Sequence, residues 1–234
     1  MGLQKTTIRR TLMKNVLLYV WAILGILSLP IMNAQISSDV KIGTQVWMTK
    51  NLDVSTYRNG DTIRYTSTPS EWQDAAIKQE GAWCYYNNDL KNGEIYGKLY
   101  NWYAVNDPRV LAPLGYHIPS KAEWSVLTNY LNGKSYNAGL KMKSTEGWID
   151  GGNGSNSSGF NGLPGGYCDY IVGFNGVGEW GWWWSSSKGY TSDATCLNMT
   201  YGYSGVNWAT SYVGRGFSVR CIKDSDTLTL SGLG

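Results

Sequence analysis

Alternating apolar and polar residues divide the chain into short predicted strands. Residues 40–48 (VKIGTQVWM) alternate and predict an opening strand. Asn59-Gly60 predicts a turn before a second short strand at residues 62–65, and residues 81–86 (GAWCYY) are strand-like. From Gly147 onward, Gly, Asn, Ser and Trp dominate, and short apolar runs predict antiparallel strands separated by long loops. These runs lie at residues 160–163, 182–184, 195–199 and 217–222.

Two segments of the first half have helical patterning. Residues 97–105 place Leu99, Trp102 and Tyr103 on one helical face and predict a helix. Ser120 and Glu123 have the S-x-x-E spacing of a capping box, which predicts a second helix over residues 121–131. The apolar stripe of this second helix is Trp124, Leu127 and Leu131. The pattern therefore predicts one α+β domain, with two helices early and a loop-rich sheet of short strands late.

The first 34 residues have the layout of a secretory signal peptide. Four basic residues and no acidic residue precede the apolar run from Val16 to Leu29. Cleavage is expected directly after Ala34, a small residue. Met13 is an alternative start. The competing interpretation is an uncleaved membrane anchor, but the apolar stretch is interrupted by Pro30 and is shorter than the ~20 residues that span a bilayer. We expect a signal peptide at 1–34, a short lead at 35–39, one domain at 40–224 and a flexible tail at 225–234.

The net charge of the chain depends on whether the expected signal peptide is included. The chain has 20 Lys and Arg against 17 Asp and Glu, a formal charge of +3. Removing four basic residues leaves 16 against 17, or −1. The basic balance therefore belongs to the export signal and gives no support for nucleic-acid binding. We expect the protein to be secreted or displayed on the outer cell surface, with the periplasm as the alternative, and to touch a membrane only if the signal stays uncleaved.

All four cysteines lie after the expected signal peptide, where disulfides are permitted. Four cysteines allow three pairings. The sequence positions favour Cys84–Cys221, which would tie the early part of the domain to its last strand, and Cys168–Cys196, which would close one loop. The alternative is that one pair stays as buried thiols. His117 is the only histidine and no C-x-x-C motif occurs, so the usual zinc site is excluded and no cofactor is expected.

Several phrases occur in an order that resembles the Fibrobacter succinogenes major paralogous domain family. The resemblance covers residues 40 to 224. The phrases that carry it include QVWMTKNL at 45–52, WCYYNND at 83–89, YGKLYNWYAV at 96–105, GYHIPS at 115–120, LPGGY at 163–167, WWSS at 183–186 and GFSVRCIKD at 216–224.

The resemblance implies a C-type-lectin-like fold related to the formylglycine-generating enzymes, and no established activity. It implies that Cys84 and Cys221 occupy family positions, whereas Cys168 and Cys196 are additional cysteines of this chain. This difference supports a disulfide between Cys168 and Cys196. The closely spaced cysteine pair that the related oxidative enzymes use is missing, since Cys221 is alone near the C-terminus. A multi-histidine iron site is excluded because His117 has no second histidine, and we interpret His117 as a structural hydrogen-bonding residue.

Calcium is the one metal for which the loops offer oxygen ligands. Residues 150–158 (DGGNGSNSS) are rich in them, but they lack the D-x-D-x-D-G pattern and a closing Glu. No calcium-binding lectin tripeptide occurs either. We therefore interpret this segment as a loop and keep calcium only as the alternative. A glycosidase would need two facing carboxylates, and nothing in the spacing of Asp150, Asp169 and Glu179 brings them together.

An aromatic cluster is the best candidate for ligand binding. Aromatic faces stack on sugar rings, and indole N–H groups orient a partner. The candidate ligand-binding residues are Tyr170, Glu179, Trp180 and Trp182. The family phrases favour a packing role for Trp183 and Trp184, together with the structural motif Ser120, Glu123 and Trp124. We expect a non-enzymatic binding or adhesion domain for a glycan or a surface protein. The alternatives are a carbohydrate-active or oxidative enzyme with dispersed site residues, or a structural component of a surface assembly.

Overall fold

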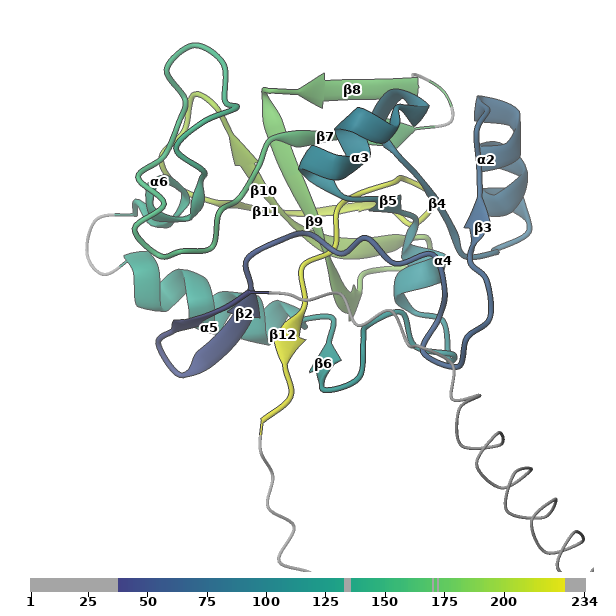
Figure 1. Ribbon diagram of the computed structural model, residues 1–234, viewed down its shortest axis with the longest axis horizontal. Helices are drawn as coiled ribbons and strands as arrows, with labels where there is room; N and C mark the ends of the chain where they lie inside the picture. Colours follow the sequence, from purple (N-terminus) through teal and green to yellow (C-terminus); the bar gives the residue numbers. More distant parts are fainter. Residues whose placement is uncertain (1–37, 133–135, 170, 172, 226–234) are drawn as a thin grey trace, which may run out of the picture. The chain divides into compact units, whose positions relative to one another are not determined.

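The computed structural model describes residues 38–132, 136–169, 171 and 173–225. Within these ranges the chain is mostly β, with twelve strands in three sheets and five short α-helices (Figure 1). The predicted α+β, C-type-lectin-like fold with two helices is therefore wrong. The runs 182–184 and 195–199 extend into the longer paired strands β9 and β10, because neighbouring segments complete their backbone hydrogen bonds. The strands predicted over 160–163 and 217–222 are wrong, since these residues make only isolated bridges apart from Ile222. The expected signal segment 1–34 and residues 226–234 of the expected tail lie outside the described residues.

The largest sheet lies in the second half of the chain and has the order β11-β10-β9-β7-β8. β9, β10 and β11 form an antiparallel meander, β7 pairs in parallel with β9, and β8 pairs antiparallel with β7. Gly178, at φ 84°, adopts the left-handed backbone in the turn between β8 and β9, a conformation that glycine accepts most easily. The five strands are β7 (Gly165–Asp169), β8 (Gly173–Val177), β9 (Trp180–Lys188), β10 (Asp193–Thr200) and β11 (Asn207–Tyr212).

Two smaller sheets join segments that are far apart in the sequence. The four-stranded sheet contains β1 (Asp39–Ile42), β2 (Gln45–Met48), β12 (Ile222–Lys223) and β6 (Tyr116–His117), in that order. The three-stranded sheet contains β3 (Arg64–Tyr65), β4 (Ala82–Cys84) and β5 (Leu99–Tyr100). The single strand expected over 40–48 is instead the β1–β2 hairpin, because Gly43 turns the chain at φ 63°.

The helices are short. They are α2 (Pro69–Ile77), α3 (Leu90–Tyr96), α4 (Trp102–Val105), α5 (Lys121–Asn132), α6 (Ala138–Met142) and the 3-10 helix η1 (Tyr86–Asn88). The helix predicted over 121–131 is confirmed as α5, and the Ser120–Glu123 capping box is present.

The prediction of a helix over residues 97–105 is wrong for its first half, which contains β5, and only Trp102–Val105 are helical. Tyr100 exchanges two backbone hydrogen bonds with Phe217, at 2.8 and 3.0 Å, which holds this segment extended as β5. The side chain of Asn101 then accepts from the backbone N–H of Ala104 and starts the single turn of α4. A long-range backbone contact therefore overrides the local helical periodicity.

β9 separates two hydrophobic clusters. Because successive side chains of a strand point to opposite faces, Trp183 joins one cluster and Trp184 the other. Trp124, Leu127 and Leu131 of α5 cover the Trp183 side. A third cluster contains Trp72 of α2, Cys84 of β4 and Cys168 of β7. Among the described residues, no helix has the length and apolar character needed to cross a membrane.

Candidate functional site

The best-formed candidate site lies on one face of the five-stranded sheet. Alternation along β9 places Trp180, Trp182 and Trp184 on this face. Trp184 is fully buried, whereas Trp180 and Trp182 are half-buried. The ring of Trp182 stacks on Phe217, with centroids 5.0 Å apart and 15° between the planes. Phe217 therefore anchors Trp182 against the core.

Tyr167 of β7 joins the two half-buried tryptophans. Its ring centroid lies 6.0 Å from that of Trp180, with the planes 22° apart, and 6.4 Å from that of Trp182, which it meets edge to face. We call Tyr167, Trp180 and Trp182 the aromatic surface. The three rings form one contiguous group because β7 and β9 are paired neighbours.

Polar groups lie beside the aromatic surface. The guanidinium carbon of Arg215 is 5.7 Å from the ring centroid of Tyr167, and its Nε donates to the buried Asp169 at 2.7 Å. Opposite β9, register places Asn198 across from Trp182 and Thr200 across from Trp180. Directly opposed residues share a face. The site therefore combines aromatic rings with amide, hydroxyl and guanidinium groups.

One polar atom of the aromatic surface is unsatisfied. Among the described residues, nothing hydrogen-bonds to the buried Nε1 of Trp182. A buried N–H without an acceptor costs free energy. By contrast, Trp183 donates to Asn51 Oδ1 at 2.9 Å and Trp184 to the Tyr100 carbonyl at 2.8 Å. Trp182 therefore differs from Trp183 and Trp184 in having a buried N–H without an acceptor.

The predicted site residues are distributed unevenly. The structure places Trp180 and Trp182 together and puts Glu179 in the turn directly before Trp180, where it is half-buried. Tyr170 lies outside the described residues. Trp183 and Trp184 are core residues at 0% exposure. The partner that the four candidate residues do not include is Tyr167, which stands on a different strand.

A polar cleft is the second candidate site, and the sequence interpretation missed it. Its volume is about 420 Å³, and it lies between the segment 49–53, α3 and the loops that carry Glu146 and Leu163. Asp53, Glu94 and Glu146 contribute carboxylates and Lys50 an ammonium group. These charges come from three separate segments, so no local motif connects them. Of these residues only Lys50 lies in one of the family phrases, so the sequence gives no signal that joins them.

One of these carboxylates has its own cation. The Nζ of Lys98, a residue that is 4% exposed, lies 2.6 Å from Asp53 Oδ1 and 3.1 Å from the Tyr85 hydroxyl. The same ammonium is 4.4 Å from the ring centroid of Trp83. Lys98 therefore neutralises Asp53 and fixes this wall of the cleft, while Glu94 and Glu146 are exposed.

His117 links two carboxylates. Its Nδ1 lies 2.7 Å from Asp224 Oδ1 and its Nε2 lies 2.7 Å from Glu123 Oε1. Burial alone would lower the pKa of His117, but the hydrogen bonds and charges of Asp224 and Glu123 outweigh burial and raise it. Both ring nitrogens are thus engaged. Across the described residues, no group of three His, Cys, Asp or Glu side chains could hold a metal ion.

Fold and site together define a mostly β domain that carries an aromatic surface on one face of its central sheet. The family model of the Fibrobacter succinogenes major domain matches residues 40–223, and the chain belongs to this family. The resemblance seen in the sequence is therefore confirmed. No curated protein and no solved structure matches the chain. The family description names no activity, so function has to be argued from the site.

Proposed function

We propose that this protein is a secreted or surface-displayed binding domain that holds a glycan on the aromatic surface. The observation that carries the proposal is the contiguous group of Tyr167, Trp180 and Trp182, in which Trp182 keeps an unpartnered N–H. Aromatic faces pack against the C–H faces of sugar rings. Binding without chemical turnover needs no more than this arrangement.

The rigid base of the site supports binding. The sheet has a hydrophobic cluster on each face, and Trp182 is stacked on Phe217. A preorganised surface loses little conformational freedom when a ligand binds, so more of the contact energy contributes to affinity. Arg215, fixed by Asp169, adds a donor at the edge for hydroxyl or carboxylate groups of the ligand.

The extracellular location rests on the sequence of residues 1–34. A basic segment, an apolar run and a small residue in that order favour export. The remaining chain has a net charge near zero, which does not favour nucleic acid as the partner. A glycan or a protein of another cell surface is the class of partner that such a location offers.

The test is binding of the protein to a glycan array, followed by affinity measurement for the best ligand. Trp180→Ala and Trp182→Phe are the informative variants, because Trp182→Phe keeps a phenyl ring on Phe217 and removes the second ring of the indole together with its N–H. We expect each to weaken binding by about 3- to 10-fold. Tyr190→Ala is the matched control, since Tyr190 is an 86% exposed aromatic residue between β9 and β10.

The outcomes separate the parts of the proposal. Unchanged affinity in both tryptophan variants would remove the aromatic surface as the site. Binding to proteins but to no glycan would refute the proposal that the ligand is a glycan and would leave the aromatic surface as the binding site. Circular dichroism of each variant confirms that a loss of binding is not a loss of fold.

The polar cleft supports a second candidate function, hydrolysis of a carbohydrate. Glu94 and Glu146 line the same cleft, and glycoside hydrolysis uses two carboxylates about 5–10 Å apart. Asp169, by contrast, is paired with Arg215, which argues against a catalytic role for it. Release of reducing sugar from a polysaccharide panel, abolished by Glu94→Gln or Glu146→Gln, would establish this activity. Absence of release from the whole panel would leave binding as the function.

A further inference from the structure

Cys84 and Cys168 lie against each other in the third hydrophobic cluster. Cys84 is the last residue of β4 and Cys168 is in β7, and they are 1% and 5% exposed. Both cysteines line the same small hollow, and the Cys168 side chain is close enough to Cys84 to influence its thiol electrostatically. A disulfide requires two cysteines whose side chains are neighbours, and these two share one cluster and one hollow.

The backbone on both sides of the pair is fixed. Cys84 is paired with Leu99 of β5 in the three-stranded sheet. Cys168 is paired with Phe174 of β8 and exchanges backbone hydrogen bonds of 3.0 and 2.8 Å with Gly216. Because each cysteine is held by a sheet, the two sulfur atoms stay neighbours and need no rearrangement of strands to bond.

The other two cysteines have different surroundings. Cys196 donates to the carbonyl oxygen of Ala209 at 3.5 Å, across the β10–β11 pair. Cys221 follows the buried Arg220 and lies in the same large cluster as Cys196, not in the cluster of Cys84. The pairs favoured by sequence position, Cys84–Cys221 and Cys168–Cys196, therefore each combine residues from two different clusters.

We propose that Cys84 and Cys168 form a disulfide that ties the three-stranded sheet to the five-stranded sheet, while Cys196 and Cys221 remain thiols. This inference rests on the proposed function only for its oxidising location outside the cell. It assigns a covalent modification site to two residues that are 84 positions apart in the chain.

The reaction is oxidation by thiol–disulfide exchange. One cysteine thiolate attacks a small-molecule disulfide such as oxidised glutathione, and one glutathione leaves as its thiol. The second cysteine then attacks the mixed disulfide and releases the other glutathione. Two S–H bonds are lost, one S–S bond forms between Cys84 and Cys168, and the two electrons and two protons reside in two glutathione thiols.

The surroundings indicate when this reaction occurs. The hollow lined by both cysteines, Trp72 and Asn88 has a volume of about 20 Å³, room for about one water molecule and not for glutathione. Burial, with the neighbouring Cys168, also raises the pKa of the Cys84 thiol well above its ordinary value. Since the thiolate is the attacking species, the folded protein reacts slowly and the bond forms during folding.

The test is refolding of the full chain from denaturant in a buffer of reduced and oxidised glutathione. We expect two of the four thiols to disappear, a mass decrease of about 2 Da for the two hydrogen atoms lost, and one crosslinked peptide pair containing Cys84 and Cys168. Folded reduced protein, treated with the same buffer, should keep its four thiols far longer.

Single variants sharpen the assignment. Cys84→Ser and Cys168→Ser should each retain three free thiols, whereas Cys196→Ser, the matched control, should retain one. Reduction should lower the urea midpoint of the wild-type protein and of Cys196→Ser, but not that of Cys168→Ser.

Three results would overturn the proposal. They are a Cys84–Cys221 peptide, a Cys168–Cys196 peptide, or four free thiols after oxidative refolding. Because the wild-type peptide map decides the pairing, a variant that fails to fold does not remove the test. The refolding experiment does not depend on export, so finding the protein inside the cell would refute the location and leave the pairing standing.

Discussion

Arg220 shows how single residues of the family phrases hold this fold together. It is 0% exposed, and its guanidinium donates to the carbonyl oxygens of Met48 and Phe160 and to Asn51 Oδ1. Burial lowers its pKa to about 9. Asn51 Oδ1 also accepts from Trp183 Nε1 at 2.9 Å. Arg220 and Trp183, which belong to two distant phrases, therefore both donate to the side-chain oxygen of Asn51, which belongs to a third.

We predict that Asn51→Ala lowers the free energy of unfolding by about 3 kcal/mol, because it removes the acceptor of the buried Trp183 N–H and one of the acceptors of the buried Arg220 guanidinium. Urea unfolding followed by tryptophan fluorescence measures the change. Lys50→Ala, at the exposed neighbouring position, serves as the control and should change stability by less than about 0.5 kcal/mol. Equal effects of the two variants would contradict the role assigned to Asn51.

His117 carries a second prediction at this scale, a pH dependence of stability. Its pKa is raised in the folded protein, so folding favours the protonated ring. The stabilisation is complete below the unfolded pKa of about 6.5 and is lost as pH rises through the folded value. Carboxyl groups titrate at lower pH and do not interfere in this window.

We expect the urea midpoint of the wild-type protein to fall, relative to that of His117→Gln, as pH rises above about 6.5. His117 is the only histidine of the chain, so the difference between the two proteins reports this one ring. Parallel pH profiles of the two proteins would show that the links to Glu123 and Asp224 do not stabilise the fold.

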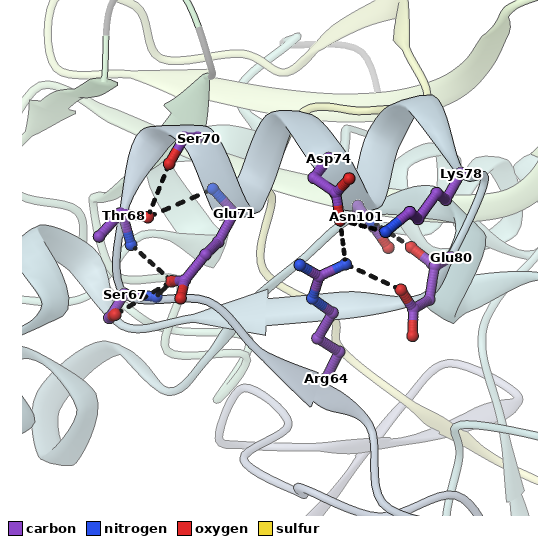
Figure 2. Close-up of polar contacts among 9 residues, drawn as sticks. All are labelled: Arg64, Ser67, Thr68, Ser70, Glu71, Asp74, Lys78, Glu80 and Asn101. Carbon is purple, nitrogen blue, oxygen red and sulfur yellow. Dashed lines mark hydrogen bonds and ion pairs between the residues drawn. The ribbon is translucent and has the colours of Figure 1, made fainter.

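At the scale of the element, α2 depends on its ends (Figure 2). Thr68 Oγ1 accepts from the backbone N–H of Glu71, and the Glu71 carboxylate accepts from the backbone N–H groups of Ser67 and Thr68. Arg64 of β3 lies 2.8 Å from the Asp74 carboxylate on the same helix. A helix this short gains little from its own hydrogen bonds, so the cap and the strand hold it in place.

Thr68→Ala tests the cap directly. We predict a loss of about 1 kcal/mol in the free energy of unfolding, the usual effect of removing an N-cap hydroxyl. Ser70→Ala is the control from the same turn, since the only contact drawn for its hydroxyl is with Thr68 Oγ1. Chemical denaturation of the three proteins under one condition gives the comparison. A larger effect of Ser70→Ala than of Thr68→Ala would refute the capping argument.

At the scale of the whole described domain, the two large clusters share β9 and β10. Trp183 and Trp184 are consecutive residues with side chains in different clusters, and Leu197 and Cys196 repeat this division on β10. Neither cluster can open without exposing residues of a strand that the other also needs. The two clusters therefore form one cooperative unit.

We predict a single unfolding transition. Tryptophan fluorescence reports side-chain burial and far-ultraviolet circular dichroism reports the sheets, and their urea midpoints should coincide. Two separated midpoints, or a fluorescence change that precedes the loss of sheet signal, would show that the clusters unfold independently.

Local signals predicted some elements correctly. The Ser120–Glu123 capping box predicted α5, and it succeeded because both partners lie within one turn. Residues 97–105 were misassigned because the partner of Tyr100 is Phe217, which no local pattern shows. Trp180 and Trp182 could be selected as candidates from the sequence, but the selection of Tyr167 over the other tyrosines of the aromatic cluster required the pairing of β7 with β9. The carboxylates of the polar cleft were missed for the same reason.

The amino-acid sequence by itself determined the family, through its ordered phrases, and the position of α5, because motif order and helix caps are local properties. Only the tertiary structure decided the mostly β architecture, the composition of the aromatic surface, the polar cleft and the meeting of Cys84 with Cys168. The physical reason is that a strand acquires its neighbours through backbone hydrogen bonds to remote segments. Alternation shows which residues share a face of one strand, and strand pairing shows what that face touches.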